Sequence, residues 1–548
     1  MIKFLLIFLS FIMLTFRCAA QCNTPETKIM VLGDSWAFFS WTNNSYNENL
    51  DRFGFTDIRA NSSIDISING ARAENYFSDP DRKQKIADFL AANPEIEYCH
   101  ISLGGNDVLG EWNKNMTTPQ LDSLLGVIVY NLRRDIDTVL SLKPDLKFII
   151  SGYDYPNFVE TAALSSLHPY YGQWTDMGQP DALEINTALA RLTQSYTDSA
   201  AVWSNVYFVN NNGLMQWTYG QTTPLIIPPY ATYPAHYVPL PGGDLNYPSP
   251  RTAMALSGTD SFHLGDDSFE CFIKRHFEEF YWVSLRDFDA SIGAADTSLN
   301  GNITSTSTNS ASIKTGKVDI DEVQGIITFN TSLLNQALDI ESASIFLNRQ
   351  NLSGGNLASQ DLTIEIKSGY FGANLQLEND DYISSGDASA IACTYGTVEK
   401  NDYWIRIDLP GSMLPFINKT GYTQFKLKYS GAGTNNYFEF KNSGDSINQP
   451  FLDVNYDFST SENEIIPQAD ILIYPNPAEE QINFSLPGSK YKRIISAELI
   501  NCTGKTVFKG DYVSSKGSIS AAGLPSGIYY LVITEGNKRE SSKIIISN

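Results

Sequence analysis

The chain has 548 residues, of which 42% are hydrophobic and 18% are charged, and its formal net charge is −23. This length is too great for one hydrophobic core and indicates about three domains of roughly 100–200 residues each. The 38 Lys and Arg residues are outnumbered by 61 Asp and Glu residues, which argues against a nucleic-acid-binding protein because phosphate contacts need clustered basic side chains.

The amino terminus has the pattern of a secretory signal peptide. A basic residue precedes a mainly apolar stretch over 4–14, and the small residues Ala19 and Ala20 follow. The apolar stretch is shorter than the roughly 20 residues of a membrane span. We therefore expect residues 1–20 to be a cleaved signal peptide, with lipid attachment at Cys22 as the weaker alternative. We expect no stable membrane insertion of the mature protein.

Residues 25–290 alternate apolar runs with amphipathic helical patterns, as a parallel sheet with both faces covered requires. The predicted strands are 28–32, 98–103, 147–151 and 206–210. The predicted helices are 81–92, 119–142, 181–199 and 266–285. Apolar residues spaced by three and four make 119–142 the clearest helix. The sequence therefore predicts a three-layer α/β/α domain.

The rest of the chain is typical of β domains joined by soft segments. Residues 291–309 and 458–468 are poor in apolar side chains and predict linkers. Short alternating segments with Gly, Asn and Asp turns predict a β-sandwich over 310–457, and residues 469–548 predict a second, small sandwich. The clearest strands are 325–330, 344–348, 362–367, 403–408, 424–429 and 451–456, then 471–474, 481–486, 496–501, 528–533 and 542–546.

A serine follows the first predicted strand directly. Gly33 permits a tight turn, and Asp34 can accept hydrogen bonds from the amides of the loop. Ser35 then lies at the carboxyl end of the strand, where open α/β sheets bind ligands. The same Gly-Asp-Ser tripeptide recurs at 444–446. We interpret that copy, which lacks a strand-to-helix context, as an ordinary turn.

Two other segments could stabilise a negative oxygen at the same edge. Gly70 follows the run 64–69 and could offer a backbone N–H that no side chain obstructs. The strand 98–103 ends in a Gly-Gly-Asn-Asp sequence, in which Asn106 could direct its side-chain amide at a developing oxyanion. Each of these segments also has a plain turn-forming interpretation.

Asp260 and His263 lie three residues apart, just ahead of the helix predicted at 266–285. On one turn both side chains can face the serine. A neutral imidazole can take the serine proton, while the carboxylate fixes the tautomer and stabilises the imidazolium. This spacing makes the two residues the partners that we expect for Ser35.

The chain has only five histidines, and the other four are weaker candidates for a base. His100 lies in the middle of a predicted strand and is expected in the core or behind the site, while His276 lies on the last helix of the α/β domain. His168 and His236 lie in a Tyr- and Pro-rich insertion over 153–251. This insertion could line or cover the site, or it could only decorate the surface.

No metal site or cofactor is expected. The sequence holds no His-Glu-x-x-His or Cys-x-x-Cys motif, and the carboxylates near His263 are explained by the partner role of Asp260 and by a helix start. Five widely spaced cysteines remain after removal of the signal peptide, so no disulfide framework can be read from them.

Four blocks resemble those of the SGNH/GDSL hydrolases, in the order of that family. They are Gly33-Asp34-Ser35, Gly70, Gly104-Gly105-Asn106-Asp107 and Asp260-Ser261-Phe262-His263. The resemblance implies a flavodoxin-like α/β/α fold and a metal-free serine esterase mechanism. It also implies that Ser35 is the nucleophile, that His263 is the base and that Asp260 orients it. The amides of Ser35 and Gly70 and the Asn106 side chain would form the oxyanion hole.

Two further resemblances concern the remaining domains. Residues 474–477, 524–531 and 543–546 resemble the type IX secretion sorting domain of Gram-negative Bacteroidota. That resemblance implies export through both membranes by the type IX machinery and a secreted or cell-surface location. The segments 425–427 and 450–454 are similar to the DNRLRE family of jelly-roll, carbohydrate-binding-like modules.

We therefore expect a secreted carboxylic-ester hydrolase. The expected ester substrate is an acetylated polysaccharide, because an appended sandwich and a secretion tail suit an insoluble substrate. A lipase or thioesterase of the same family would use the same residues. The alternative from another class is a carbohydrate-binding surface protein whose α/β domain is catalytically idle.

Overall fold

The computed structural model describes residues 24–546 except for 204, 221–239, 355–361, 392, 397–399, 430–432, 445–447, 458–471, 475–477, 479, 486–494, 502–504, 513–515 and 536–537. The expected signal peptide at 1–20, the linker at 458–468 and His236 lie outside the described residues. The chain divides into two compact units. One contains Glu26–Asn49, Ile58–Leu285 and Ile465–Asn548, and the other contains Leu50–Asp57 and Arg286–Glu464.

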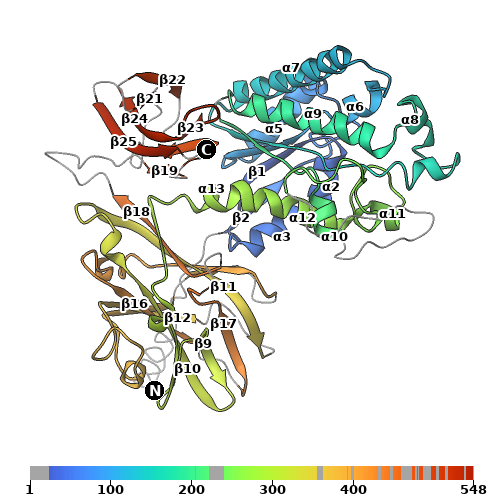
Figure 1. Ribbon diagram of the computed structural model, residues 1–548. Helices are drawn as coiled ribbons and strands as arrows, with labels where there is room; N and C mark the ends of the chain where they lie inside the picture. Colours follow the sequence, from blue (N-terminus) through green and yellow to red (C-terminus); the bar gives the residue numbers. More distant parts are fainter. Residues whose placement is uncertain are drawn as a thin grey trace, which may run out of the picture. The chain divides into compact units, whose positions relative to one another are not determined.

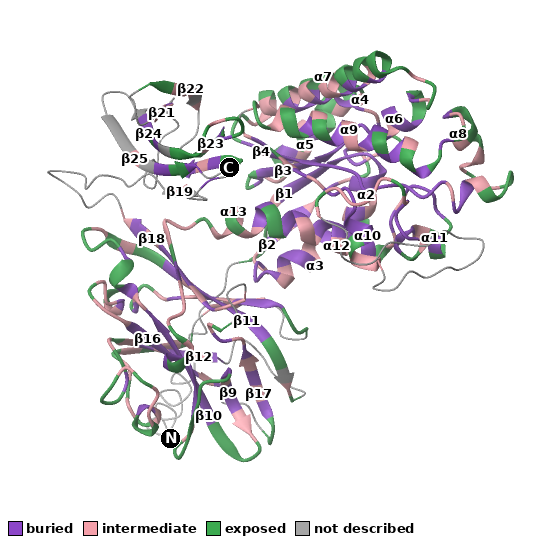
Figure 2. Ribbon diagram, in the orientation of Figure 1, coloured by how far each residue is buried: buried purple, intermediate pink, exposed green. Residues whose placement is uncertain are grey.

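The α/β part of the first unit is built on a five-stranded parallel sheet with the order β2-β1-β3-β4-β5. Its strands are β1 (Glu26–Gly33), β2 (Ile58–Asn61), β3 (Tyr98–Ser102), β4 (Lys147–Ser151) and β5 (Val206–Val209). This is the strand order of flavodoxin-like folds. Figure 2 shows β1, β3 and β4 as mainly buried, as expected for strands covered on both faces. The predicted α/β class is confirmed.

Helices cover both faces of this sheet (Figure 1). The helices of this part of the chain are α2 (Ser35–Thr42), α3 (Ser45–Arg52), α4 (Asn75–Ser78), α5 (Pro80–Ala92), α6 (Gly105–Glu111), α7 (Thr118–Leu142), α8 (Tyr171–Asp176), α9 (Ala182–Ala200), α10 (Leu214–Tyr219), α11 (Ala255–Gly258), α12 (Asp266–His276) and α13 (Trp282–Arg286), of which α8 and α11 lie away from the sheet. Helix α7 buries Leu121, Leu125, Ile128 and Leu132 on one side, which is the stripe that its apolar spacing predicts. The helix predicted over 266–285 is interrupted by a π-helical turn at Phe277–Tyr281.

The second unit is antiparallel β structure around a main core, which contains side chains such as Ile345, Ile364, Ile407 and Leu427, with a smaller buried cluster beside it. Its strands are β6 (Ala290–Gly293), β7 (Gly301–Ile303), β8 (Thr308–Asn309), β9 (Ile313–Val318), β10 (Asp321–Phe329), β11 (Asp339–Ser353), β12 (Leu362–Ser368), β13 (Ala388–Ile391), β14 (Cys393–Tyr395), β15 (Trp404–Asp408), β16 (Thr423–Tyr429), β17 (Asn436–Phe440) and β18 (Phe451–Asp457). The predicted β region after the α/β domain is confirmed.

The linker predicted over 291–309 is wrong, because this stretch belongs to the β structure. Strand β6 pairs with β18, and β7 pairs with β10 and β8. The polar composition misled the prediction. Some of the polar side chains here are buried, and they form hydrogen bonds with backbone carbonyl groups. The Asn300 side chain donates to the carbonyls of Ala295 and Asp296 at 2.7 and 2.9 Å.

A short segment that precedes β2 also belongs to the second unit. Phe55 is fully buried, with its ring centroid 6.1 Å from that of Phe346. Asp57 forms an ion pair with Arg406 at 2.6 Å. The predicted boundary of 25–290 for the α/β domain therefore misses an excursion of the chain over Leu50–Asp57.

The carboxyl-terminal region has its own core of buried side chains, which includes Ile482, Leu499, Leu531 and Ile544. Its strands are β19 (Leu472–Tyr474), β20 (Gln481–Ser485), β21 (Ile495–Asn501), β22 (Thr506–Tyr512), β23 (Lys516–Ser520), β24 (Gly527–Glu535) and β25 (Lys538–Ile546). They form a three-stranded sheet, β19-β20-β23, and a four-stranded sheet, β22-β21-β24-β25. Among the helices of the described residues, none has the length and apolar character needed to cross a membrane.

Candidate active site

Ser35 begins helix α2 directly after strand β1. Asp34 is the N-cap of this helix and accepts the Trp36 amide hydrogen at 2.9 Å. The turn requires glycine at position 33, where φ is +145° and a Cβ atom would lie 2.1 Å from the Ser102 carbonyl oxygen. The structure thus holds the serine at the carboxyl edge of the sheet, as the sequence predicts.

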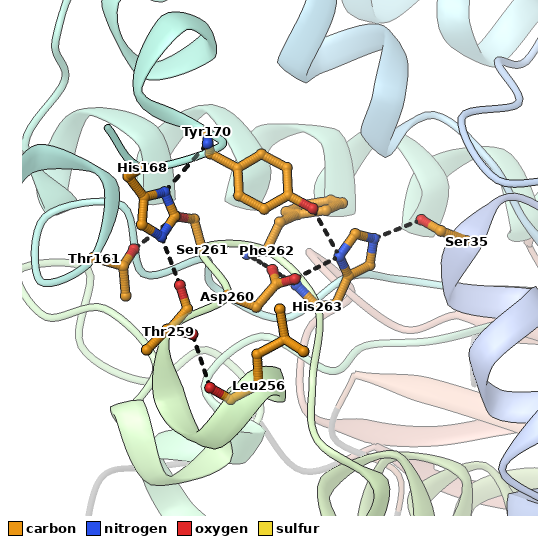
Figure 3. Close-up of polar contacts among 10 residues, drawn as sticks. All are labelled: Ser35, Thr161, His168, Tyr170, Leu256, Thr259, Asp260, Ser261, Phe262 and His263. Carbon is orange, nitrogen blue, oxygen red and sulfur yellow. Dashed lines mark hydrogen bonds and ion pairs between the residues drawn. The ribbon is translucent and has the colours of Figure 1, made fainter. Parts of the chain in front are cut away.

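The side chains of Ser35, His263 and Asp260 form a continuous hydrogen-bonded chain (Figure 3). Ser35 Oγ lies 2.9 Å from His263 Nε2, and His263 Nδ1 lies 3.1 Å from Asp260 Oδ2. The second carboxylate oxygen of Asp260 accepts the amide hydrogens of Phe262 and His263, each at 2.7 Å. With Nδ1 protonated and donating to Asp260, the Nε2 atom is left to accept the serine proton.

Asp260 is kept ionised in spite of its burial. Burial by itself raises the pKa of this carboxyl, but the hydrogen bond and charge of His263 and the two amide donors outweigh it and lower the pKa below its usual value. An ionised carboxylate beside Nδ1 stabilises an imidazolium. The group can therefore support proton transfer from a serine.

Gly70 and Asn106, the two other residues of the expected oxyanion hole, differ in their contacts with the segment around Ser35. Gly70 is exposed with φ +77°, and a Cβ atom there would meet no atom within 4 Å. Asn106 Nδ2 lies 3.0 Å from the Ala71 carbonyl oxygen and 3.4 Å from Asp34 Oδ2. The Asn106 amide therefore links the segment after Gly70 to the residue before Ser35, and both of its hydrogens have acceptors in this arrangement.

Sequence reasoning missed the role of the insertion tyrosines. The Tyr153 hydroxyl donates to Asp34 Oδ2 at 2.5 Å, and the Tyr170 hydroxyl lies 3.2 Å from His263 Nδ1. Burial raises the pKa of Asp34 to about 7, although the Tyr153 hydrogen bond opposes this effect. The insertion thus lines the site, one of the two interpretations left open. The abundance of tyrosine in this segment was the only available signal.

The remaining described histidines do not reach Ser35. His100 is 1% exposed in β3, which confirms its predicted core position, and its ring centroid lies 4.7 Å from that of buried His276. His168 Nε2 lies 2.7 Å from the Thr259 carbonyl oxygen. Within the described part of the chain, no group of three or more His, Cys, Asp and Glu side chains is arranged to hold a metal ion.

Residues 472–547 match the family model of the secretion system C-terminal sorting domain, which confirms the predicted sorting domain. The chain thus carries the export signal of type IX secretion in Bacteroidota, and this implies contact with that machinery. A search of the curated proteins finds no match to this sequence.

Several solved structures are similar to parts of the chain. PorZ, a surface component of the type IX secretion system of Porphyromonas gingivalis, is 15% identical over 18% of this chain and 14% of its own, with a TM-score of 0.14. A family 3 carbohydrate esterase from Talaromyces cellulolyticus is 12% identical over 47% of this chain and 97% of its own, with a TM-score of 0.28. The carbohydrate acetylesterase Est24 from Sinorhizobium meliloti is 11% identical over 47% and 99%, also with a TM-score of 0.28.

Proposed function

We propose that this protein is an exported serine ester hydrolase of the SGNH/GDSL type. Ser35 is the nucleophile, His263 is the general base and Asp260 orients the imidazole. The observation that carries the proposal is the hydrogen-bonded chain from Ser35 Oγ through both ring nitrogens of His263 to Asp260. A serine hydroxyl needs such a base to attack a carbonyl carbon at neutral pH.

The reaction proceeds in two acyl-transfer steps. His263 Nε2 takes the proton of Ser35 Oγ as the oxygen attacks the ester carbonyl, and then gives that proton to the leaving alkoxide. Water attacks the resulting acyl-serine with the same base, which releases the acid and restores Ser35. The Ser35 and Gly70 amides and the Asn106 side chain donate to the oxyanion. For this, Asn106 exchanges its hydrogen bond to Asp34 or Ala71 for one to the substrate oxygen.

The favoured substrate is an acetylated polysaccharide. A β domain and a sorting domain appended to the α/β fold suit an enzyme that works outside the cell on an insoluble polymer. Acetate release from acetylated xylan, compared with hydrolysis of p-nitrophenyl esters of increasing acyl length, distinguishes this substrate from those of a lipase or thioesterase. Faster hydrolysis of long-chain esters together with no acetate release would favour the lipase alternative.

The nucleophile is tested with the full chain on p-nitrophenyl acetate. Ser35→Ala should lower kcat by about three orders of magnitude or more, because the nucleophile carries the covalent step. Its melting temperature should change little, since the change removes one hydroxyl. Ser446→Ala, in the second Gly-Asp-Ser tripeptide, is the matched control and should keep full activity. Retention of more than about a tenth of the activity in Ser35→Ala would reject the assignment.

The base and its orienting carboxylate are separated by their pH dependence. Activity should rise with pH, because a general base accepts a proton only in its unprotonated form. Asp260→Asn removes the charge that stabilises the imidazolium, so the midpoint of the rise should fall to lower pH and the maximal rate should also drop. His263→Ala should be the more damaging change. If His263→Ala kept substantial activity and His168→Ala lost it, the base would lie in the insertion.

A further inference from the structure

The loop that carries Asp260 and His263 has an unusual backbone. Leu256 and Ser257 have φ values of +52° and +58°, and Gly258 follows with +80°. Residues other than glycine rarely adopt this left-handed conformation, and they keep it only where their surroundings determine it. The position of the two site residues therefore depends on what holds the loop from outside.

The insertion holds this loop first at Ser261, which is fully buried between Asp260 and Phe262. The Asn157 amide donates to the Ser261 carbonyl oxygen at 2.8 Å. The Thr161 hydroxyl lies 2.6 Å from the Ser261 hydroxyl and donates to the Asn157 carbonyl oxygen. Because Thr161 uses its one hydrogen on Asn157, the Ser261 hydroxyl must be the donor in the bond that the two hydroxyls share.

His168 and Tyr170 form a second set of contacts between the insertion and this loop (Figure 3). His168 Nδ1 accepts the Tyr170 amide hydrogen at 3.2 Å, so Nε2 carries the ring hydrogen and donates to the Thr259 carbonyl oxygen at 2.7 Å. The bond from the Tyr170 amide to His168 also fixes the backbone from which the Tyr170 side chain extends. The Tyr170 hydroxyl lies 3.2 Å from His263 Nδ1, and it is close enough to the Asp260 carboxylate for that negative charge to raise the pKa of Tyr170.

We infer that residues 157–170 act as a clamp that positions Asp260 and His263 for catalysis. Tyr170 is the positioning residue, because its hydroxyl lies 3.2 Å from His263 Nδ1, while Thr161 and His168 hold the loop on either side of Asp260. This inference rests on the proposed esterase function. It means that the insertion not only lines the site but also raises the rate at which bound substrate is converted.

The Tyr170 hydroxyl has a defined electrostatic effect. Burial and the negative charge of Asp260 raise the pKa of Tyr170 to about 12, so its hydroxyl keeps its proton at working pH. The dipole of this neutral hydroxyl, near the carboxylate, offsets part of the charge that faces the imidazole. Tyr170→Phe should therefore let Asp260 stabilise the imidazolium more strongly. The midpoint of the pH–rate profile should then move up by a few tenths of a pH unit.

The experiment measures kcat, KM and the pH–rate profile of the full chain on p-nitrophenyl acetate. Tyr170→Phe and Thr161→Val should each lower kcat by about tenfold or more while KM stays within about twofold, because misplaced groups slow turnover. Thr161→Ser keeps the hydroxyl and should restore kcat. Tyr171→Phe, which removes the hydroxyl of the neighbouring tyrosine, is the control and should match the wild type.

The outcomes separate this inference from the proposed function. If Ser35→Ala is inactive while Tyr170→Phe keeps both the wild-type kcat and the wild-type midpoint, the clamp is refuted and the esterase assignment stands. A rise in KM without a fall in kcat would also refute the clamp, since the segment would then only contact substrate. If Ser35→Ala stays active, the proposed function itself fails. Should Thr161→Val not fold, Tyr170→Phe decides the question alone.

Discussion

Replacing His276 by glutamine should make the α/β fold less sensitive to acid. His276 is fully buried on α12, where its Nδ1 donates to the Phe272 carbonyl oxygen at 2.9 Å. Its Nε2 has no hydrogen-bond partner among the described residues, and the neighbouring ring is that of His100. Burial lowers the pKa of His276 from 6.5 to about 4, because a charged imidazole would lose its hydration there.

The magnitude follows from proton linkage. The unfolded chain binds a proton at His276 below pH 6.5, whereas the folded chain binds it only near pH 4. Between these values the unfolded state holds more protons, so the free energy of unfolding decreases as the pH falls. At about 1.36 kcal/mol per pKa unit, the full loss is about 3 kcal/mol. Burial also lowers the pKa of His100, which steepens the loss in the same direction.

Urea unfolding followed by tryptophan fluorescence, at several values between pH 7.5 and pH 4.5, measures this dependence. Wild-type protein should lose stability more steeply with acid than His276→Gln, whose side chain does not titrate. Lys274→Gln, a change at an exposed position of the same helix, serves as the control and should follow the wild type. The same pH dependence for wild type and His276→Gln would refute the burial argument.

Two further predictions concern backbone geometry and domain organisation. Gly33→Ala should abolish hydrolysis and lower the melting temperature, because the new Cβ atom would lie 2.1 Å from the Ser102 carbonyl oxygen; an active variant would show that the turn can relax. A chain that ends at Ala290 should be poorly soluble and less stable, because Asp57 and its buried neighbours would lose partners such as Arg406. Size-exclusion chromatography and a thermal melt check this, and a monodisperse, fully stable truncated protein would contradict it.

The predicted site residues could be found because they occupy ends of regular elements. Ser35 follows a buried strand, and Asn106 follows the strand that lies beside it in the sheet. Asp260 and His263 precede a helix with a clear apolar stripe. The carboxyl ends of parallel strands meet at one edge of the sheet, which places Ser35 and Asn106 together. The resemblance to the SGNH/GDSL blocks was needed to add Asp260 and His263 to the same site.

The contacts of the insertion could not be predicted in this way. Tyr170 and His263 are 93 residues apart, and Tyr153 and Asp34 are 119 apart. Neither tyrosine lies in a periodic segment whose face the sequence would reveal. The excursion at Leu50–Asp57 was missed for a similar reason, since its partners, Phe346, Gly396 and Arg406 among them, lie about 290 to 350 residues later in the chain.

The sequence by itself determined the α/β class, the β region that follows it, the sorting domain and the residue types of the candidate site. The α/β class and the β region depend on hydrophobic periodicity and turn residues, which are properties of neighbouring residues. The sorting domain and the site residues were found through short motifs that resemble those of known families. Only the tertiary structure decided which side chains support Asp260 and His263, and that residues 291–309 form strands. Such contacts depend on the path that irregular segments take in space. The backbone hydrogen bonds of these segments do not require a periodic pattern of side chains, so the sequence does not reveal them.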